Sequence, residues 1–131
     1  MSLTLSLDWE FTTTIEKLWS AITDSNKLAK WVMENDFKPV VGHQFQFRTQ
    51  PNAYWDGIVR GTVLIVDEPN RLSYTFAGGE EHIVTLTLHD LGDGKVKLHL
   101  EQTGISNPQA LGGAKYGWTN WTSELEKLLA A

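Results

Sequence analysis

The spacing of apolar residues changes near the C-terminal end of the chain, and this change constrains the fold more than any other feature. Over much of the chain up to position 101, apolar and polar residues alternate, which is typical of half-buried strands. From position 111 onward, apolar residues recur every three or four positions, which predicts one face of a long helix. This apolar stripe consists of Leu111, Ala114, Trp118, Trp121, Leu125 and Leu128. A sheet with an apolar face is the only surface large enough to cover such a stripe.

Five alternating segments and one nearly continuous apolar run, at 58–66, predict about six strands. The first covers Leu3 to Phe11, and the others follow at 44–48, 58–66, 72–76, 83–89 and 96–101. Short turn sequences join them, and the clearest is Gly92-Asp93-Gly94, which predicts a hairpin. Because strands joined by short turns run in opposite directions, the sheet is expected to be antiparallel.

Two short helices are predicted between the first and second strands. Thr13 and Glu16 match a capping box at the start of the first helix, which should end near Asp24. Asp24 or Ser25 then caps a second helix that reaches about position 32. Asn107, which a proline follows, is the expected cap of the long C-terminal helix.

The expected architecture is an α+β fold in a single domain that spans residues 1–131. A curved antiparallel sheet of about six strands wraps around the long C-terminal helix, and the two short helices come after the first strand. The segment 35–42, with Pro39 and Gly42, is expected to be irregular. Where a twisted sheet wraps imperfectly around a helix, a cavity can remain between them.

Composition and charge exclude several classes of function. The 11 Lys and Arg residues and 16 Asp and Glu residues give a net charge of −5 with no basic run, which argues against a nucleic-acid partner. No apolar run approaches the roughly 20 residues of a membrane span, and the first residues do not resemble a signal peptide. We therefore expect a cytoplasmic protein with no membrane partner.

The sequence also lacks the patterns of metal centres and active sites. It contains no Cys, and the histidines at 43, 82, 89 and 99 do not have metal-ligand spacing, so we expect surface histidines and no metal. The acidic residues are scattered, and neither a nucleophile motif nor a phosphate-binding loop is present. The sequence therefore predicts a protein that is not an enzyme, with no catalytic residues and no cofactor.

Aromatic residues are the best candidates for a functional site. The chain has 6 Trp, 5 Phe and 3 Tyr, and those on inner faces form either a packed core or the lining of a ligand cavity. Gly112, Gly113 and Gly117 lie next to bulky rings in the sequence of the last helix, which favours gaps in the packing. The predicted cavity residues are Phe45, Phe47, Tyr74, Phe76, Leu86, Leu98, Leu100, Trp118 and Trp121. A buried Tyr or Trp among them also needs a partner for its polar hydrogen.

A second aromatic feature lies in the predicted loop at 50–57. Tyr54 and Trp55 are adjacent there, and such a pair either folds over the mouth of the cavity or forms an exposed contact patch. Arg48 and Arg60 are the nearest cations in sequence, and they either bind an acidic group of a ligand or form surface ion pairs. Tyr54, Trp55 and Arg60 are therefore assigned to the cavity mouth or to a contact loop.

Five segments in a fixed order carry a resemblance to a known family. They are LWSAITD at 18–24, KWVMENDFKPVVGHQFQF at 30–47, GTV at 61–63, EPNRLSYTF at 68–76 and GW at 117–118. Together they resemble the bacterial homologues of the activator of the heat-shock-protein-90 ATPase (Aha-type proteins), over nearly the whole chain. The resemblance implies membership of the START/Bet v 1-like superfamily, whose helix-grip fold is the architecture expected above.

The resemblance also brings several functions into consideration. The superfamily includes lipid and polyketide binders, polyketide cyclases, and domains that contact a chaperone. Taken with the aromatic residues, it favours binding of a small hydrophobic or aromatic molecule between the sheet and the C-terminal helix, without catalysis. The alternatives are a co-chaperone-like protein-interaction domain that binds a chaperone in the stress response and, second, a polyketide cyclase-like enzyme.

Overall fold

The computed structural model describes residues 2–51, 53 and 55–130. Its elements, in chain order, are β1 (Leu3–Thr12), α1 (Ile15–Thr23), α2 (Ser25–Trp31), β2 (Glu34–Asn35), β3 (Gln44–Arg48), β4 (Ile58–Asp67), β5 (Arg71–Ala77), β6 (Glu81–Gly92), β7 (Lys95–Ile105) and α3 (Pro108–Ala130). The α+β fold and the order of its elements confirm the sequence prediction. No helix of the described residues is both long enough and apolar enough to cross a membrane.

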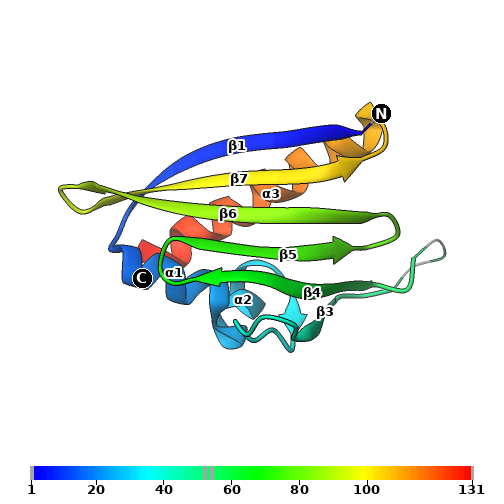
Figure 1. Ribbon diagram of the computed structural model, residues 1–131, viewed down its shortest axis with the longest axis horizontal. Coiled ribbons are helices and arrows are strands. Elements are labelled where there is room, and N and C mark those ends of the chain that lie inside the picture. The colour runs from blue at the N-terminus through cyan, green and yellow to red at the C-terminus, as the bar shows by residue number, and fades with distance from the viewer. Residues whose placement is uncertain (1, 52, 54, 131) are drawn as a thin grey trace.

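One antiparallel sheet holds the seven strands in the order β1-β7-β6-β5-β4-β3-β2 (Figure 1). The first strand of the chain therefore lies at one edge, beside the last strand. The strand that the sequence did not indicate is β2, whose residues Glu34 and Asn35 pair with Arg48 and Phe47. A strand of two residues is too short to show alternation, so periodicity cannot reveal it.

Side-chain caps begin the three helices. Thr14, and not the expected Thr13, caps α1, because its hydroxyl accepts a hydrogen bond from the Lys17 backbone N–H at 3.2 Å. The capping-box pattern favoured Thr13 because Glu16 follows it by three residues, but the first helical hydrogen bond runs from the Leu18 N–H to the Thr14 carbonyl oxygen, so Thr14 occupies the cap position. Asp24 caps α2, and the Asn107 side-chain oxygen accepts from the Ala110 N–H at 2.8 Å, as expected for the start of α3.

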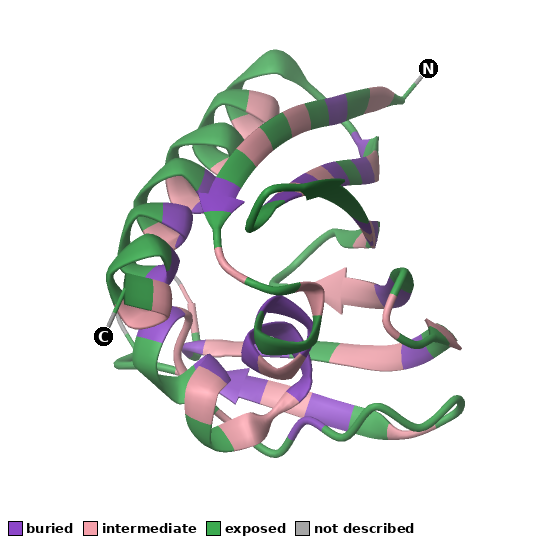
Figure 2. Cartoon of the chain, turned by 90° about the vertical axis from the view of Figure 1, so that its left-hand side faces the viewer, coloured by how far each residue is buried: buried purple, intermediate pink, exposed green. Residues whose placement is uncertain are grey.

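The helices cover one face of the curved sheet, which we call the inner face. In Figure 1 the sheet lies in front and α3 runs behind it, while Figure 2 shows buried residues of α3 and of the strands turned toward a common interior. Along β7, for example, Val96, Leu98 and Leu100 are buried and alternate with the more exposed Lys97 and His99. This alternation is the period of 2 on which the strand prediction relied.

Candidate functional site

The structure brings the nine predicted cavity residues together on the inner side of the fold. They come from β3, β5, β6, β7 and α3, and all are buried except Phe76 and Trp121, which are half-buried. Their placement between sheet and helix follows from alternation in the strands and from the helical stripe. The grouping of these side chains agrees with the prediction, and their role as a cavity lining remains a prediction.

The aromatic rings among them form a continuous series of contacts. Phe45 and Tyr74 have ring centroids 5.4 Å apart, Tyr74 and Phe76 6.2 Å, and Phe76 and Trp118 6.4 Å. Trp118 in turn contacts Trp121 edge to face at 5.1 Å. Such tilted and edge-to-face geometries are the favourable ones for aromatic pairs. A ligand that enters this interior must therefore separate rings that contact one another.

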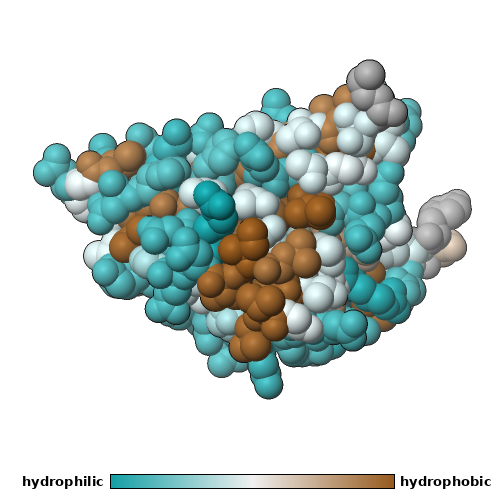
Figure 3. Space-filling model, in the orientation of Figure 1, coloured by the Kyte–Doolittle hydropathy of each residue, from teal (hydrophilic) through white to brown (hydrophobic). Residues whose placement is uncertain are grey.

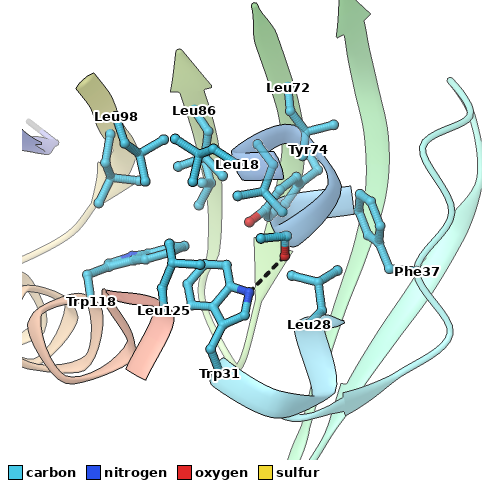
Figure 4. Packing of buried hydrophobic residues seen from close by; sticks show 14 of the residues in the cluster. Leu18, Leu28, Trp31, Phe37, Leu72, Tyr74, Leu86, Leu98, Trp118 and Leu125 are labelled. Atoms are coloured by element: carbon cyan, nitrogen blue, oxygen red, sulfur yellow. Dashed lines mark hydrogen bonds between the residues drawn. The ribbon is translucent and has the colours of Figure 1, made fainter. Parts of the chain in front are cut away.

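Phe37 and Trp31, which were not assigned to the site, join this series of ring contacts (Figure 4). Phe37 contacts Phe45 at 5.0 Å and Tyr74 at 5.8 Å, and Trp31 of α2 lies 6.5 Å from Trp118. Trp31 has helical spacing with Leu28 and could have been placed in the core. Phe37 lies alone in irregular chain, where no periodicity indicates the direction of a side chain.

The glycines of α3 do not create gaps next to the rings. A Cβ atom added to Gly112, Gly113 or Gly117 would meet no atom within 4 Å, so these positions face open space. Successive residues of a helix point about 100° apart, so a glycine next to a tryptophan in sequence lies on a different side of the helix. The expectation that these glycines loosen the packing around Trp118 is therefore wrong.

The buried polar hydrogens of the cluster differ in how they are satisfied. The Trp118 indole N–H donates to the Gln102 side-chain oxygen at 2.7 Å, and that of Trp31 donates to the Ala21 carbonyl oxygen at 2.8 Å. Among the described residues, the fully enclosed side-chain polar atom without a partner is Thr13 Oγ1, so the hydroxyl of Tyr74 is not an unsatisfied enclosed group although the residue is only 5% exposed. Burial raises the pKa of Tyr74 well above its usual range, so the hydroxyl stays protonated and can donate.

Of the residues assigned to the cavity mouth, Trp55 lies at the margin of the buried core and Arg60 lies on the surface. Trp55 is half-buried, packs against the edge of the core, and donates its indole N–H to the Ile58 carbonyl oxygen at 3.3 Å. Arg60 is exposed, and its guanidinium lies 3.3 Å from a carboxylate oxygen of Asp56. Trp55 and Arg60 share a surface depression of about 410 Å³. Tyr54 lies outside the described residues.

A second depression, of about 650 Å³, lies on the outer side of β3, β4 and β5. Its lining is mostly polar and includes Gln44, Gln46, Arg60, Thr62, Thr75 and Glu81. Arg48, like Arg60, takes part in surface ion pairs: it lies 3.9 Å from carboxylate oxygens of Glu34 and Asp36. A polar and open depression of this kind does not match the predicted apolar cavity.

The outer face also carries one apolar area (Figure 3). Val40, Val41, Leu64 and Ile65 are each between 40% and 63% exposed. Backbone hydrogen bonds from Gly42 and to His43 join the turn of Val40 and Val41 to Val63 in β4, so these four residues are neighbours. We call them the outer apolar patch.

Among the described residues, no group of three His, Cys, Asp or Glu side chains is placed to hold a metal ion. His82 departs from the expectation of a surface histidine, since only 13% of its side chain is exposed. His99 remains closer to that expectation, with 27% of its side chain exposed.

Comparisons with known proteins find one matching family. Residues 12–130 match the family described as "Activator of Hsp90 ATPase homolog 1-like protein". Among solved structures, protein MLL2253 of Mesorhizobium loti is 35% identical, with a TM-score of 0.89 over 98% of this chain and 97% of that one. CalU16 of Micromonospora echinospora is 25% identical, with a TM-score of 0.83 over 98% of this chain and 76% of that one.

A more distant structure is an HSP90 activator of Plasmodium falciparum, which is 20% identical, with a TM-score of 0.80 over 98% of this chain and 96% of that one. At this level of identity the likeness concerns the fold alone. A comparison with curated proteins found no match.

Proposed function

This chain belongs to the family of activator of Hsp90 ATPase homolog 1-like proteins, and we propose that it binds a small hydrophobic or aromatic molecule between the sheet and α3, without catalysis. The observation that carries the proposal is the series of contacting rings from Tyr74 through Phe76 to Trp118, which reaches the half-buried Trp121 near the surface. The Tyr74 hydroxyl stays protonated and could donate to an acceptor oxygen of the ligand.

The proposed ligand lies against Tyr74, Phe76 and Trp118, whose rings contact one another in the absence of a ligand. Apolar burial provides a gross drive of about 25 cal/mol per Å², from which the cost of separating the rings and of association must be subtracted. The half-buried residues Phe76 and Trp121 mark the side on which this cluster comes nearest to the surface. Ligand entry is therefore proposed at this side.

A thermal-shift screen against flavonoids, fatty acids, sterols and aromatic polyketides tests the proposal. A ligand at about 100 times its dissociation constant adds roughly 2.7 kcal/mol to the stability, which raises Tm by several degrees for a protein of this size. We expect a concentration-dependent shift for one of these chemical classes. A screen without any shift would contradict the proposal.

Variants of Tyr74 and of another tyrosine separate binding from folding. For a ligand with an acceptor oxygen, Tyr74→Phe should weaken binding several-fold while leaving Tm of the free protein unchanged or higher, since the ring stays and no hydrogen bond is lost. Tyr116→Phe is the matched control, because Tyr116 lies on α3 and is 73% exposed. Equal affinities for both variants would show that the ligand does not contact the Tyr74 hydroxyl.

A co-chaperone-like function is the second candidate, and the outer apolar patch favours it. Exposed apolar residues that lie together often mark a protein contact, and the named activity of the Plasmodium falciparum relative supplies the partner to test. If the chain stimulates an Hsp90 ATPase through this patch, the double variant Val41→Asp, Leu64→Asp should lose most of the stimulation. Leu91→Asp is the control, because Leu91 is similarly exposed on the β6–β7 hairpin. Absence of stimulation by the unmodified chain would reject this candidate.

A further inference from the structure

A chain of hydrogen bonds leads from the surface to the aromatic interior at the end of the sheet where β7 leads into α3. The Glu80 carboxylate lies 2.6 Å from His82 Nε2, and His82 Nδ1 lies 2.7 Å from the Gln102 side-chain nitrogen. The Gln102 side-chain oxygen then accepts from the Trp118 indole N–H at 2.7 Å. Gln102 and Trp118 are each 3% exposed, so the inner half of the chain is shielded from water.

The chemistry of its ends fixes the direction of every bond in this chain. An indole N–H only donates, so the Gln102 oxygen must face Trp118 and the Gln102 amide nitrogen must face His82. That amide nitrogen only donates, so His82 Nδ1 must be an acceptor without a proton. His82 is therefore neutral in this arrangement, and its Nε2–H donates to Glu80.

Glu80 is the charged group that contacts His82. Its pKa is held below the ordinary value first by the hydrogen bond from His82 and then by hydrogen bonding from the side chain and backbone of Ser106, so it remains a carboxylate. The neighbouring Glu81 lines the outer depression and lies on the opposite face of the sheet. On β7, Glu101 binds His99, also away from the interior. The nearest charge before Trp118 on α3 is the exposed Lys115.

We propose that this series of hydrogen bonds is a proton-sensitive latch. Protonation of His82 breaks it and releases Trp118 from β7. An imidazolium carries a proton on both nitrogens, so its Nδ1–H would point at the Gln102 amide N–H. Rotating the Gln102 amide to accept from His82 would turn its NH₂ group toward the Trp118 indole N–H. Only neutral His82 therefore allows all three hydrogen bonds, from Trp118 to Gln102, from Gln102 to His82 and from His82 to Glu80. Protonated His82 keeps its hydrogen bond to Glu80, but the connection through Gln102 to Trp118 is lost.

The indole N–H of Trp118 reports directly on the latch. In a series from about pH 8 to about pH 5, across which imidazoles titrate, we expect its NMR signal to shift and its protection against hydrogen exchange to fall about tenfold. Trp118→Phe identifies the signal among those of the six tryptophans. A Trp118 signal that keeps its position and its protection over the whole series would overturn the proposal.

Three variants distinguish the latch from general effects of pH. In His82→Phe the Trp118 signal should no longer respond to pH, whereas His89→Gln, which removes an exposed histidine from β6, should leave the response intact. In Gln102→Glu the pH response should be reversed, so that the Trp118 indole N–H is better protected at low pH. The reason is that a carboxylate accepts hydrogen bonds both from the indole and from protonated His82. A response in His82→Phe equal to that of the unmodified protein would contradict the proposal. This test requires no ligand and is independent of the proposed function.

Discussion

Gly61 and Gly113 both lack a side chain, but their surroundings are opposite. A Cβ atom on Gly61 in β4 would overlap the carbonyl oxygen of Thr75 and the ring of Phe45. The missing side chain thus lets the Phe45 ring lie against the strand that neighbours its own, and so sets one wall of the aromatic cluster. A Cβ atom on Gly113 in α3 would meet no atom within 4 Å.

The two glycines therefore predict opposite effects of the same substitution. Gly61→Ala should lower the free energy of unfolding by about 1–3 kcal/mol, because the backbone of β5 cannot move aside without disturbing the sheet. Gly113→Ala should raise it by up to about 1 kcal/mol, since alanine favours the helix and has room there. Urea unfolding of both variants measures the difference, and a Gly61→Ala variant as stable as the unmodified protein would show that the aromatic cluster tolerates displacement.

At the level of elements, a polar contact joins the outer sides of β1 and β7. His99 Nδ1 lies 2.7 Å from a carboxylate oxygen of Asp8, and His99 Nε2 lies 3.2 Å from Glu101. The hydrogen bond to Asp8, followed by that to Glu101, raises the pKa of His99 above 6.5. The same bond with His99 lowers the pKa of Asp8 below 3.8. These contacts fasten an edge strand whose only strand partner in the described sheet is β7.

Each pKa shift predicts its own pH dependence of the stability. The raised pKa of His99 gives a stabilisation that is full below pH 6.5 and is lost as the pH rises through the folded-state value. The lowered pKa of Asp8 gives a second stabilisation, which is present above pH 3.8 and is lost as the pH falls through the folded-state value. Hence His99→Gln should reduce stability most between pH 3.8 and 6.5 and least at alkaline pH.

Urea unfolding of the variant and the unmodified protein across this range checks the pH prediction. His89→Gln is the matched control, because His89 is an exposed histidine on the adjacent strand β6. If His99→Gln destabilised the protein equally at pH 5 and pH 8, the charge of His99 beside Asp8 would not contribute to the free energy of unfolding. The comparison of differences between variants removes the common pH dependence of the rest of the chain.

At the level of the whole molecule, periodicity carried most of the prediction of the fold. Alternation in β3, β5, β6 and β7 assigned each side chain to the inner or outer face, and the stripe of α3 identified the residues that meet them. These faces are determined locally, so one sequence contains the information. The grouping of Phe45, Tyr74, Phe76 and Trp118 was predictable for this reason.

The contacts of the polar residues were not predictable in the same way. Gln102 and His82 lie on different strands, and their hydrogen bond depends on the register between β6 and β7, which alternation leaves open. Phe37 reaches the cluster from irregular chain, where the path of the backbone depends on tertiary contacts. The solvent-facing side of Gly113, by contrast, follows from the apolar stripe of α3, to which Gly113 does not belong.

The pairing of β1 with β7 has a consequence for the synthesis of the protein. Every residue pair in this part of the sheet joins positions roughly 80 to 100 residues apart, so the contact order is high and folding is expected to be slow. On a ribosome adding about 5–20 residues per second, β1 waits from about 4 to about 20 seconds for its partner strand. Throughout that interval its apolar side chains are exposed on the nascent chain, and they are available to any chaperone that binds there.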